Sequence, residues 1–295
     1  MTMSSNGAQR ARRTVRVLVP VVLGALGVSL AVPAAAGASP GGRGATPPDA
    51  TIGQYSPNKS RPLTGPELQR TAAKEQRATE YYRALTARSQ GGVTPAAATS
   101  ANLAEPYYQQ VNEVYCGPAT TTMVAGYLGV GWTGSASSQQ DAAANLLGTT
   151  NDGTSWYGSD NVPSYPGTSW YPVQDVLNYR LYQAHGQAGE WYTATALPDS
   201  PTAAQQTQFA TNLVYTISHG YPEADNQYSI PGYQLPYQPN GTWYHWWSAR
   251  GYQSSGNTTG INDPAAFANG QEHWVTTKGG AHTVVVAIGG RGYIW

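Results

Sequence analysis

The stretch QQVNEVYCGPATTTMVAGYLG, residues 109–129, contains the only cysteine of the 295-residue chain, Cys116. Gly117 and Pro118 follow it, and they allow a tight entry and a fixed φ in the first turn of a helix. Apolar residues then recur at helical spacing up to Gly129, which is a typical helix stop. The pattern predicts a helix that begins at the cysteine. Unpaired N–H groups and the helix dipole favour an anion there, so the thiol tends toward the nucleophilic thiolate.

The N-terminus predicts export from the cell. A basic segment ending at Arg16 precedes an apolar run over residues 17–33, and small residues follow at 34–38. This pattern is typical of a cleaved secretory signal peptide, which we assign to residues 1–38. The apolar run is short for a membrane anchor, so we expect no stable membrane insertion after cleavage. A pair of arginines leaves open whether export follows the general or the twin-arginine route.

Composition narrows the class of function. Residues 1–38 contain four arginines and no acidic residue, so their removal changes the formal net charge from 0 to −4. Such a charge does not suggest a nucleic-acid partner. The chain has 21 Tyr and 9 Trp against 2 Phe, which suits half-wet clefts as well as cores. With one cysteine there is no intramolecular disulfide, and the exported thiol is either buried and inert or used in catalysis.

Composition also divides the chain into a leader and a globular domain. Residues 39–63 are rich in Gly, Pro, Ser and Thr and predict a disordered segment. A capping signature then opens a charged helix over 64–88. This helix is interpreted as a propeptide, a stalk that spans the wall, or a peripheral helix packed on the domain. In the propeptide case, a chain starting near Leu103 stays folded and at least as active. We assign 39–102 to the leader and 103–295 to the domain.

The domain is expected to mix helices and strands. Helices are predicted at residues 137–148, 172–186 and 201–222, strands at 190–197, 241–253 and around 273–277, and segment 282–295 is ambiguous between the two. His185 and His219 fall next to glycines at helix ends, where histidine is ordinary structure.

Catalysis by a thiol needs a base, a group that orients the base, and donors for the oxyanion. His245, His273 and His282 remain as candidate bases. His245 is favoured because it lies inside a predicted strand, which is more rigid than a glycine-rich loop. Alternation places Trp243 and Trp247 on the same face, where indoles could exclude water. A packed core histidine is the alternative interpretation. No metal site or cofactor is predicted, because no His, Cys or carboxylate cluster has ligand spacing.

Three motifs in order carry a family resemblance: YCGPATTTMVAGYLG (115–129), YHWWSARGY (244–252) and INDPAAF (261–267). Together they resemble papain-like cysteine peptidases of the bacteriocin-processing, double-glycine-leader type, in a stand-alone secreted form. The resemblance covers about residues 105–270. It implies an α+β, papain-like fold, with the nucleophile at a helix N-terminus packed against an antiparallel β-sheet that carries the His and the Asp.

The resemblance also implies the roles of four residues. Cys116 is the nucleophile, His245 the base and Asp263 the group that orients the base. Gln110, six residues before the cysteine, and the Cys116 backbone N–H form the oxyanion hole. Asn262 competes with Asp263, but neighbours in an extended segment point to opposite faces, so only one can face the ring.

Departures from the family pattern limit what is implied about the substrate. Tyr115 stands where the family often has Asp, and HWW replaces the usual apolar strand after the histidine. We expect a peptide or protein substrate, with the cell wall as a further partner. Two alternatives stay open: a Cys-His amidase or transglutaminase acting on peptidoglycan or protein, and an aromatic-rich module that binds wall glycan or peptide without turnover.

Overall fold

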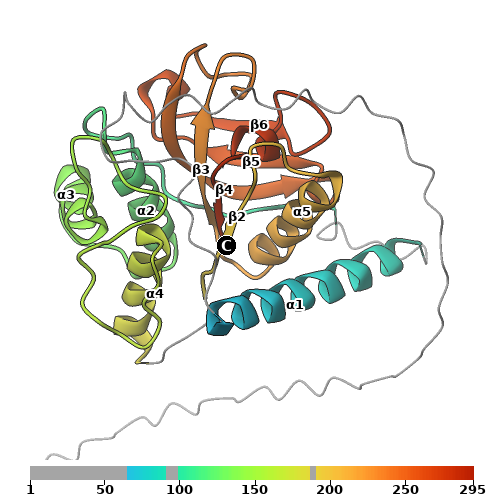
Figure 1. Ribbon diagram of the computed structural model, residues 1–295, viewed down its shortest axis with the longest axis horizontal. Coiled ribbons are helices and arrows are strands. Elements are labelled where there is room, and N and C mark those ends of the chain that lie inside the picture. Colours follow the sequence, from blue (N-terminus) through green and yellow to red (C-terminus); the bar gives the residue numbers. More distant parts are fainter. Residues whose placement is uncertain (1–64, 91–98, 187–190) are drawn as a thin grey trace, which may run out of the picture. The chain divides into compact units, whose positions relative to one another are not determined.

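The structure of the protein, a computed structural model, describes residues 65–90, 99–186 and 191–295. The predicted signal peptide and the predicted disordered segment 39–63 lie outside these residues. The described chain contains a seven-stranded sheet whose strand pairs are all antiparallel, together with several helices (Figure 1). The prediction of an α+β fold is confirmed.

The central strand of the sheet carries His245. The strands are β1 (Ala101–Asn102), β2 (Ala194–Ala196), β3 (Glu223–Ser229), β4 (Trp243–Gln253), β5 (Thr258–Asn262), β6 (Glu272–Thr276) and β7 (Gly292–Ile294). Their spatial order is β2-β7-β3-β4-β5-β6, and β1 also pairs with β4. Gln227 on β3 lies opposite His245, and Ser248 lies opposite Asn262 on β5. β3 therefore pairs with β4 at His245, and the pairing of β4 with β5 begins three residues later, at Ser248.

The helices follow the predicted segments. They are α1 (Gly65–Gln90), α2 (Cys116–Tyr127), α3 (Ala136–Leu147), α4 (Pro172–His185), α5 (Ala203–Ser218) and the short α6 (Val284–Ala287), with 3-10 turns at Ser254–Gly256 and Ala266–Ala268. Thr202 and Gln205 form a capping box at the start of α5. The ambiguous segment 282–295 forms both element types, α6 and then β7. Strands β1, β3 and β5 were not among the strands predicted from the sequence.

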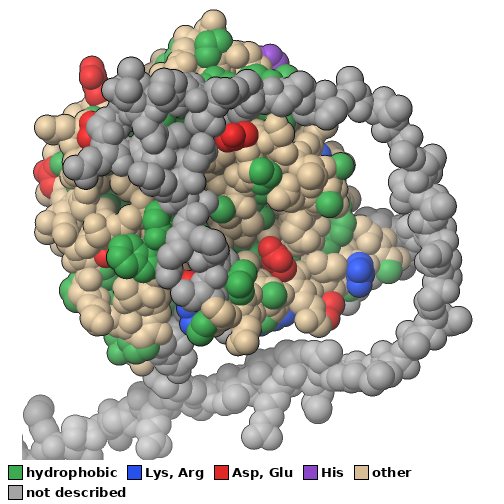
Figure 2. All heavy atoms as spheres, viewed as in Figure 1, with side chains coloured by type: hydrophobic (Ala, Val, Ile, Leu, Met, Phe, Trp, Pro, Cys, Tyr) green, Lys and Arg blue, Asp and Glu red, His purple; other side chains and the backbone are tan. Residues whose placement is uncertain are grey.

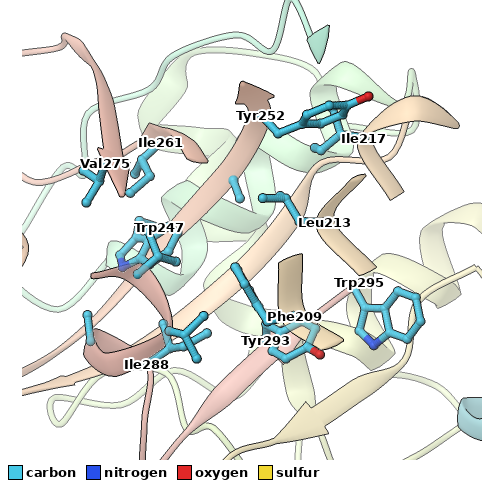
Figure 3. Packing of buried hydrophobic residues seen from close by; sticks show 14 of the residues in the cluster. Phe209, Leu213, Ile217, Trp247, Tyr252, Ile261, Val275, Ile288, Tyr293 and Trp295 are labelled. Carbon is cyan, nitrogen blue, oxygen red and sulfur yellow. The ribbon is translucent and has the colours of Figure 1, made fainter. Parts of the chain in front are cut away.

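Two hydrophobic cores lie on opposite faces of the sheet, because neighbouring side chains of β4 point to opposite sides. Trp246 packs with residues of α2, α3 and α4. Trp247, whose side chain is fully buried, packs with residues of α5, α6, β5 and β7 (Figure 3). The helical core holds the start of α2, and the second core supports β4 from behind, so both sides of the site rest on packed structure.

Helix α1 packs against α5 rather than standing apart from the domain (Figure 1). Thr71 and Thr193 hydroxyls are 2.7 Å apart, and Lys74 Nζ donates to the Trp191 carbonyl at 2.8 Å. Lys74 Nζ also lies 4.5 Å from the Trp295 ring centre. This is the arrangement of a peripheral packed helix. Release of α1 as a propeptide, or a role as a stalk, stays a prediction.

Charged residues make up 11% of the chain. On the face shown in Figure 2, acidic and basic side chains are scattered among neutral ones and do not gather in a basic patch. Of the helices that the structure describes, none is both long and apolar enough to cross a membrane.

Candidate active site

Cys116 is the first residue of α2, as the sequence predicts. Tyr115 precedes it with φ −95° and ψ 21°, and its side chain forms no cap hydrogen bond. Pro118 in the first turn has no N–H to satisfy. Cys116 is buried, with 7% of the residue exposed. The thiol thus lies buried at an uncapped helix N-terminus.

Gly117 is required by a close approach of the chain. A Cβ atom at this position would lie 2.3 Å from the Thr154 hydroxyl oxygen and 2.4 Å from the Thr154 Cβ. The Thr154 carbonyl in turn accepts a 3.0 Å hydrogen bond from the indole of Trp246 on β4. This contact ties the start of α2 to the sheet, so it sets the position of the cysteine relative to β4.

His245 is buried on β4 between two aromatic rings. Its ring centre lies 5.4 Å from that of Trp243 and 5.8 Å from that of Phe267. The expected flank by Trp247 is replaced: this indole points into the second core and donates to Gln227 at 3.2 Å. The rings of Trp243 and Phe267 limit water access to the imidazole.

Asp263, directly after β5, binds the histidine. His245 Nε2 is 2.6 Å from Asp263 Oδ1. The same oxygen accepts from the Ala265 backbone N–H at 2.9 Å. The second oxygen, Oδ2, accepts from the Tyr237 hydroxyl at 2.9 Å and from the Gln238 amide at 3.3 Å. Four donors therefore surround a carboxylate that has no exposed surface.

The charges in the site favour an ion pair between the His245 imidazolium and the Asp263 carboxylate. Burial alone lowers the pKa of His245, but the charge and hydrogen bond of Asp263, aided by a hydrogen bond to Cys116, outweigh burial and raise the pKa to about 10. Burial raises the pKa of Asp263, yet His245, Ala265 and Tyr237 together bring it below its ordinary value. The imidazolium is thus the stable form at neutral pH. Because Nε2 is occupied by Asp263, Nδ1 is the ring nitrogen left for Cys116.

Gln110 is joined to the same region through the backbone. Its N–H donates to the Pro264 carbonyl at 2.9 Å, so the segment before α2 touches the segment after Asp263. Its side-chain amide donates to the Asn112 carbonyl at 2.9 Å. One N–H of that NH₂ group is therefore occupied, and one remains for a second acceptor.

Asn262 is directed away from the imidazole. Its amide donates to Glu105 Oε2 at 2.9 Å, and the Ser248 hydroxyl donates to the same oxygen at 2.6 Å. Burial raises the pKa of Glu105 to about 7, although hydrogen bonds from Ser248 and Asn262 oppose the rise. Of the two neighbours, only Asp263 contacts His245.

The remaining histidines occupy other places. His185 ends α4 and His219 caps α5, each before a glycine with positive φ. His282 Nδ1 lies 2.8 Å from the Gln234 carbonyl. His273 stacks on Tyr237, with ring centres 3.7 Å apart. Neither His273 nor His282 contacts the pair formed by His245 and Asp263.

Tyr237 and Gln238 were missed by sequence reasoning. They lie in YQLPYQPNG, residues 233–241, which has no periodicity and reads as a connection. A pocket of about 530 Å³ opens along this connection, lined by Gly232, Gln234, Leu235, Pro236, Gln238, Asn240 and His282. Cys116 and His245 do not line it. Within the described residues, no group of three or more His, Cys, Asp or Glu side chains could hold a metal ion.

The family model described as the Peptidase_C39 like family matches residues 103–289. Among solved structures, a C39-like peptidase from Bacillus anthracis matches with a TM-score of 0.35 and 15% identity, over 66% of this chain and 96% of that chain. A search of the curated proteins found no match.

Proposed function

The chain belongs to the Peptidase_C39 like family, and we propose that it is a cysteine peptidase with a catalytic triad of Cys116, His245 and Asp263. One observation carries the proposal: a single buried imidazole joins the other two groups. It lies 2.6 Å from Asp263 through Nε2, and Cys116 is close enough to raise the pKa of the same ring. A nucleophile, its base and the group orienting the base are the parts that thiol catalysis requires.

The proposed reaction starts from the Cys116 thiolate and the His245 imidazolium. The Cys116 thiolate attacks the scissile carbonyl carbon, and a C–S bond forms as the carbonyl oxygen becomes an oxyanion. His245 gives its Nδ1 proton to the leaving nitrogen while the C–N bond breaks, which leaves a thioester. Neutral His245 then takes a proton from water, and the resulting hydroxide attacks the thioester. Cys116 leaves as thiolate, so the pair of Cys116 thiolate and His245 imidazolium is restored. Asp263 orients the ring throughout and stabilises it whenever it is the charged imidazolium.

Two donors are proposed for the oxyanion. The first is the Cys116 backbone N–H at the uncapped start of α2. The second is the N–H of the Gln110 amide that does not bind Asn112. Donors fixed before the reaction stabilise developing charge most effectively, because they need no reorganisation. Replacement of Gln110 by Ala should therefore lower kcat by about 10²-fold or more with little change in KM.

The substrate is proposed to be a peptide or protein outside the cell. Family membership supports the peptide bond as target. The basic and apolar pattern of residues 1–38 supports export with cleavage near residue 38. Sequencing the N-terminus of protein recovered from the culture medium tests this: an intact Met1, or protein retained in the cells, contradicts it.

Alkylation of Cys116 by iodoacetate tests the triad without a substrate. This anion reacts fast only while thiolate and imidazolium coexist, so the rate should form a bell against pH. His245→Ala should abolish the bell and leave a single ionisation, that of a thiol without an imidazolium partner. If the wild type itself shows only that ionisation, the peptidase proposal is wrong.

Product analysis separates the neighbouring chemistries. A peptidase creates new peptide amino termini in a protein mixture, whereas a transglutaminase releases ammonia and joins amines to glutamine. Cys116→Ala is the matched control and should give neither product. Equal binding of a ligand by wild type and Cys116→Ala, without turnover by either, would instead support a binding module.

A further inference from the structure

The connection between β3 and β4, residues 230–242, wraps around the carboxylate of Asp263. We propose that Tyr237 on this connection is a positioning residue, whose hydroxyl, with the amide of Gln238, holds Asp263 in line with His245 Nε2. The proposal rests on the function proposed above. It assigns a role to residues that lie outside the three family motifs.

Division of the donors between the two oxygens is the first support. Oδ1 takes His245 and the Ala265 N–H, and Oδ2 takes Tyr237 and Gln238. Donors on both oxygens fix the rotation of a carboxylate about its Cβ–Cγ bond. Without the Tyr237 hydroxyl, only the 3.3 Å contact from Gln238 would remain on Oδ2. The carboxylate could then turn away from the imidazole.

Gln238 is itself fixed by a reciprocal pair of amides. Gln227 on β3 donates to Gln238 Oε1 at 2.8 Å, and Gln238 donates back at 3.0 Å. The Leu235 backbone N–H also donates to Gln238 Oε1, at 3.1 Å. Gln227 lies opposite His245 in the pairing of β3 with β4. Gln227 therefore helps to position both the His245 imidazole and the connection that binds Asp263.

Tyr237 is held by stacking on His273 of β6. Its ring is 3.7 Å from the His273 ring centre at an angle of 8°. His273 lies on β6 and its Nε2 is 3.1 Å from the Ala268 carbonyl. The stack orients the phenol so that its hydroxyl points to Asp263. This gives His273 a structural task in the same assembly.

The titratable groups facing Asp263 are His245 on β4, Tyr237 on the connection and Tyr107 before α2. Burial, followed by the charge of Asp263, raises the pKa of both tyrosines, so they stay protonated at neutral pH. Tyr237 can therefore act as a donor across the working range. The only one of these groups that changes charge near the alkaline limb of the reaction is His245.

Tyr237→Phe tests the proposal, because it removes the hydroxyl and keeps the stacked ring. The readout is the alkaline limb of iodoacetate alkylation, which falls as His245 loses its proton. If Tyr237 positions Asp263, the limb moves down by roughly one pH unit, the size of one hydrogen bond to a charged group. On a peptide that the wild type cleaves, kcat should fall about tenfold with KM unchanged.

Tyr192→Phe is the matched control. Tyr192 is 2% exposed and its hydroxyl donates to the Pro222 carbonyl at 2.8 Å, so this variant also loses one buried donor. Its alkaline limb should stay where it is in the wild type. A limb that moves in both variants reports general loosening and overturns the proposal.

Other outcomes also decide the matter. A limb that moves up in Tyr237→Phe means that the hydroxyl only weakens the carboxylate charge, and an unmoved limb means that it does nothing; either overturns the proposal. If Tyr237→Phe does not fold, His273→Ala carries the test, and an unchanged limb there overturns it. If the wild type shows no bell, the proposed function itself fails, which is a different result from a wild-type bell that Tyr237→Phe leaves intact.

Discussion

Replacement of Asp263 by Asn removes the charge that stabilises the imidazolium and leaves the shape of the side chain. The pKa of His245 is about 10 against an ordinary 6.5, which corresponds to about 5 kcal/mol in favour of the charged ring. Burial opposes this gain, so with a neutral amide the pKa of His245 should fall by about 3.5 units or more, to its ordinary 6.5 or below. At neutral pH the ring would then be mostly uncharged. We expect kcat/KM at pH 7 to fall at least about 100-fold.

Asp263→Asn should also lower the free energy of unfolding, because it disrupts hydrogen bonds of the site. Oδ1 and Oδ2 of Asp263 accept from four donors: His245, Ala265, Tyr237 and Gln238. An asparagine offers one oxygen, so its NH₂ group must face at least one of these donors that cannot reverse. Breaking a buried ion pair from one side costs about 3–5 kcal/mol in the free energy of unfolding.

The pH dependence of that cost has a definite sign. The raised pKa of His245 gives stability that is complete below about pH 6.5 and is lost as pH rises through about 10. The lowered pKa of Asp263 gives stability that is present above about pH 3.8 and is lost as pH falls further. The difference in Tm between wild type and Asp263→Asn should therefore be largest between about pH 4 and 6.5.

The assay is the iodoacetate profile, with denaturation curves at matched pH. Asp152→Asn is the control, because it removes the same charge from an exposed loop residue. It should change neither measurement. An Asp263→Asn variant that keeps the wild-type alkaline limb would refute the reasoning, since Asp263 would then not be what holds the proton on His245.

Three further predictions concern stability. Gly117→Ala places a Cβ 2.3 Å from the Thr154 hydroxyl, so it should lower the free energy of unfolding by about 1–3 kcal/mol and slow the alkylation of Cys116. Gly65→Ala is the control, because its added Cβ meets open space. Equal Tm values for the two variants would contradict this prediction. Trp247→Ala should cost about 3–5 kcal/mol in urea denaturation, and a cost below 1 kcal/mol would mean that the second core does not depend on it. Burial raises the pKa of Glu223 to about 8, while Lys74 opposes the rise, so stability is lost as pH rises from about 4.5 to 8. Glu223→Gln should therefore be more stable than wild type by on the order of 3 kcal/mol at pH 8, and equally stable at pH 4. A variant that is less stable than wild type at pH 8 would contradict the assignment.

The parts of the site that the sequence predicts are those with local signals. The Gly-Pro pair after Cys116 sets a helix start through sterics within one turn, and that start is found where expected. The alternation of aromatic residues around His245 predicts a strand, which β4 confirms. The resemblance implies Asp263, and the opposite directions of neighbouring side chains predict that only one of Asn262 and Asp263 faces the ring; the two do bind different partners.

Strand β3 shows why the rest could not be predicted. Its sequence, EADNQYS, has no apolar alternation, yet all seven residues are buried. The strand lies between β7 and β4, and its polar groups are covered from both sides by other elements. Gln227 and Asn226 bind Gln238 and the His245 carbonyl, which are distant along the chain. Such a strand is stabilised by tertiary pairing, and periodicity carries no trace of that pairing.

The three members of the proposed triad are positioned by different kinds of structure. Cys116 is positioned by a helix start, and His245 by a strand, but the direction of the Asp263 carboxylate depends on contacts from a connection without regular structure. Gln227 links the two kinds of support, since it pairs with His245 across the sheet and with Gln238 on the connection. A change at Gln227 should therefore reach both the imidazole and its carboxylate. Gln227→Ala should move the alkaline limb further than Tyr237→Phe does, and a smaller movement would place the main support of Asp263 outside the amide pair.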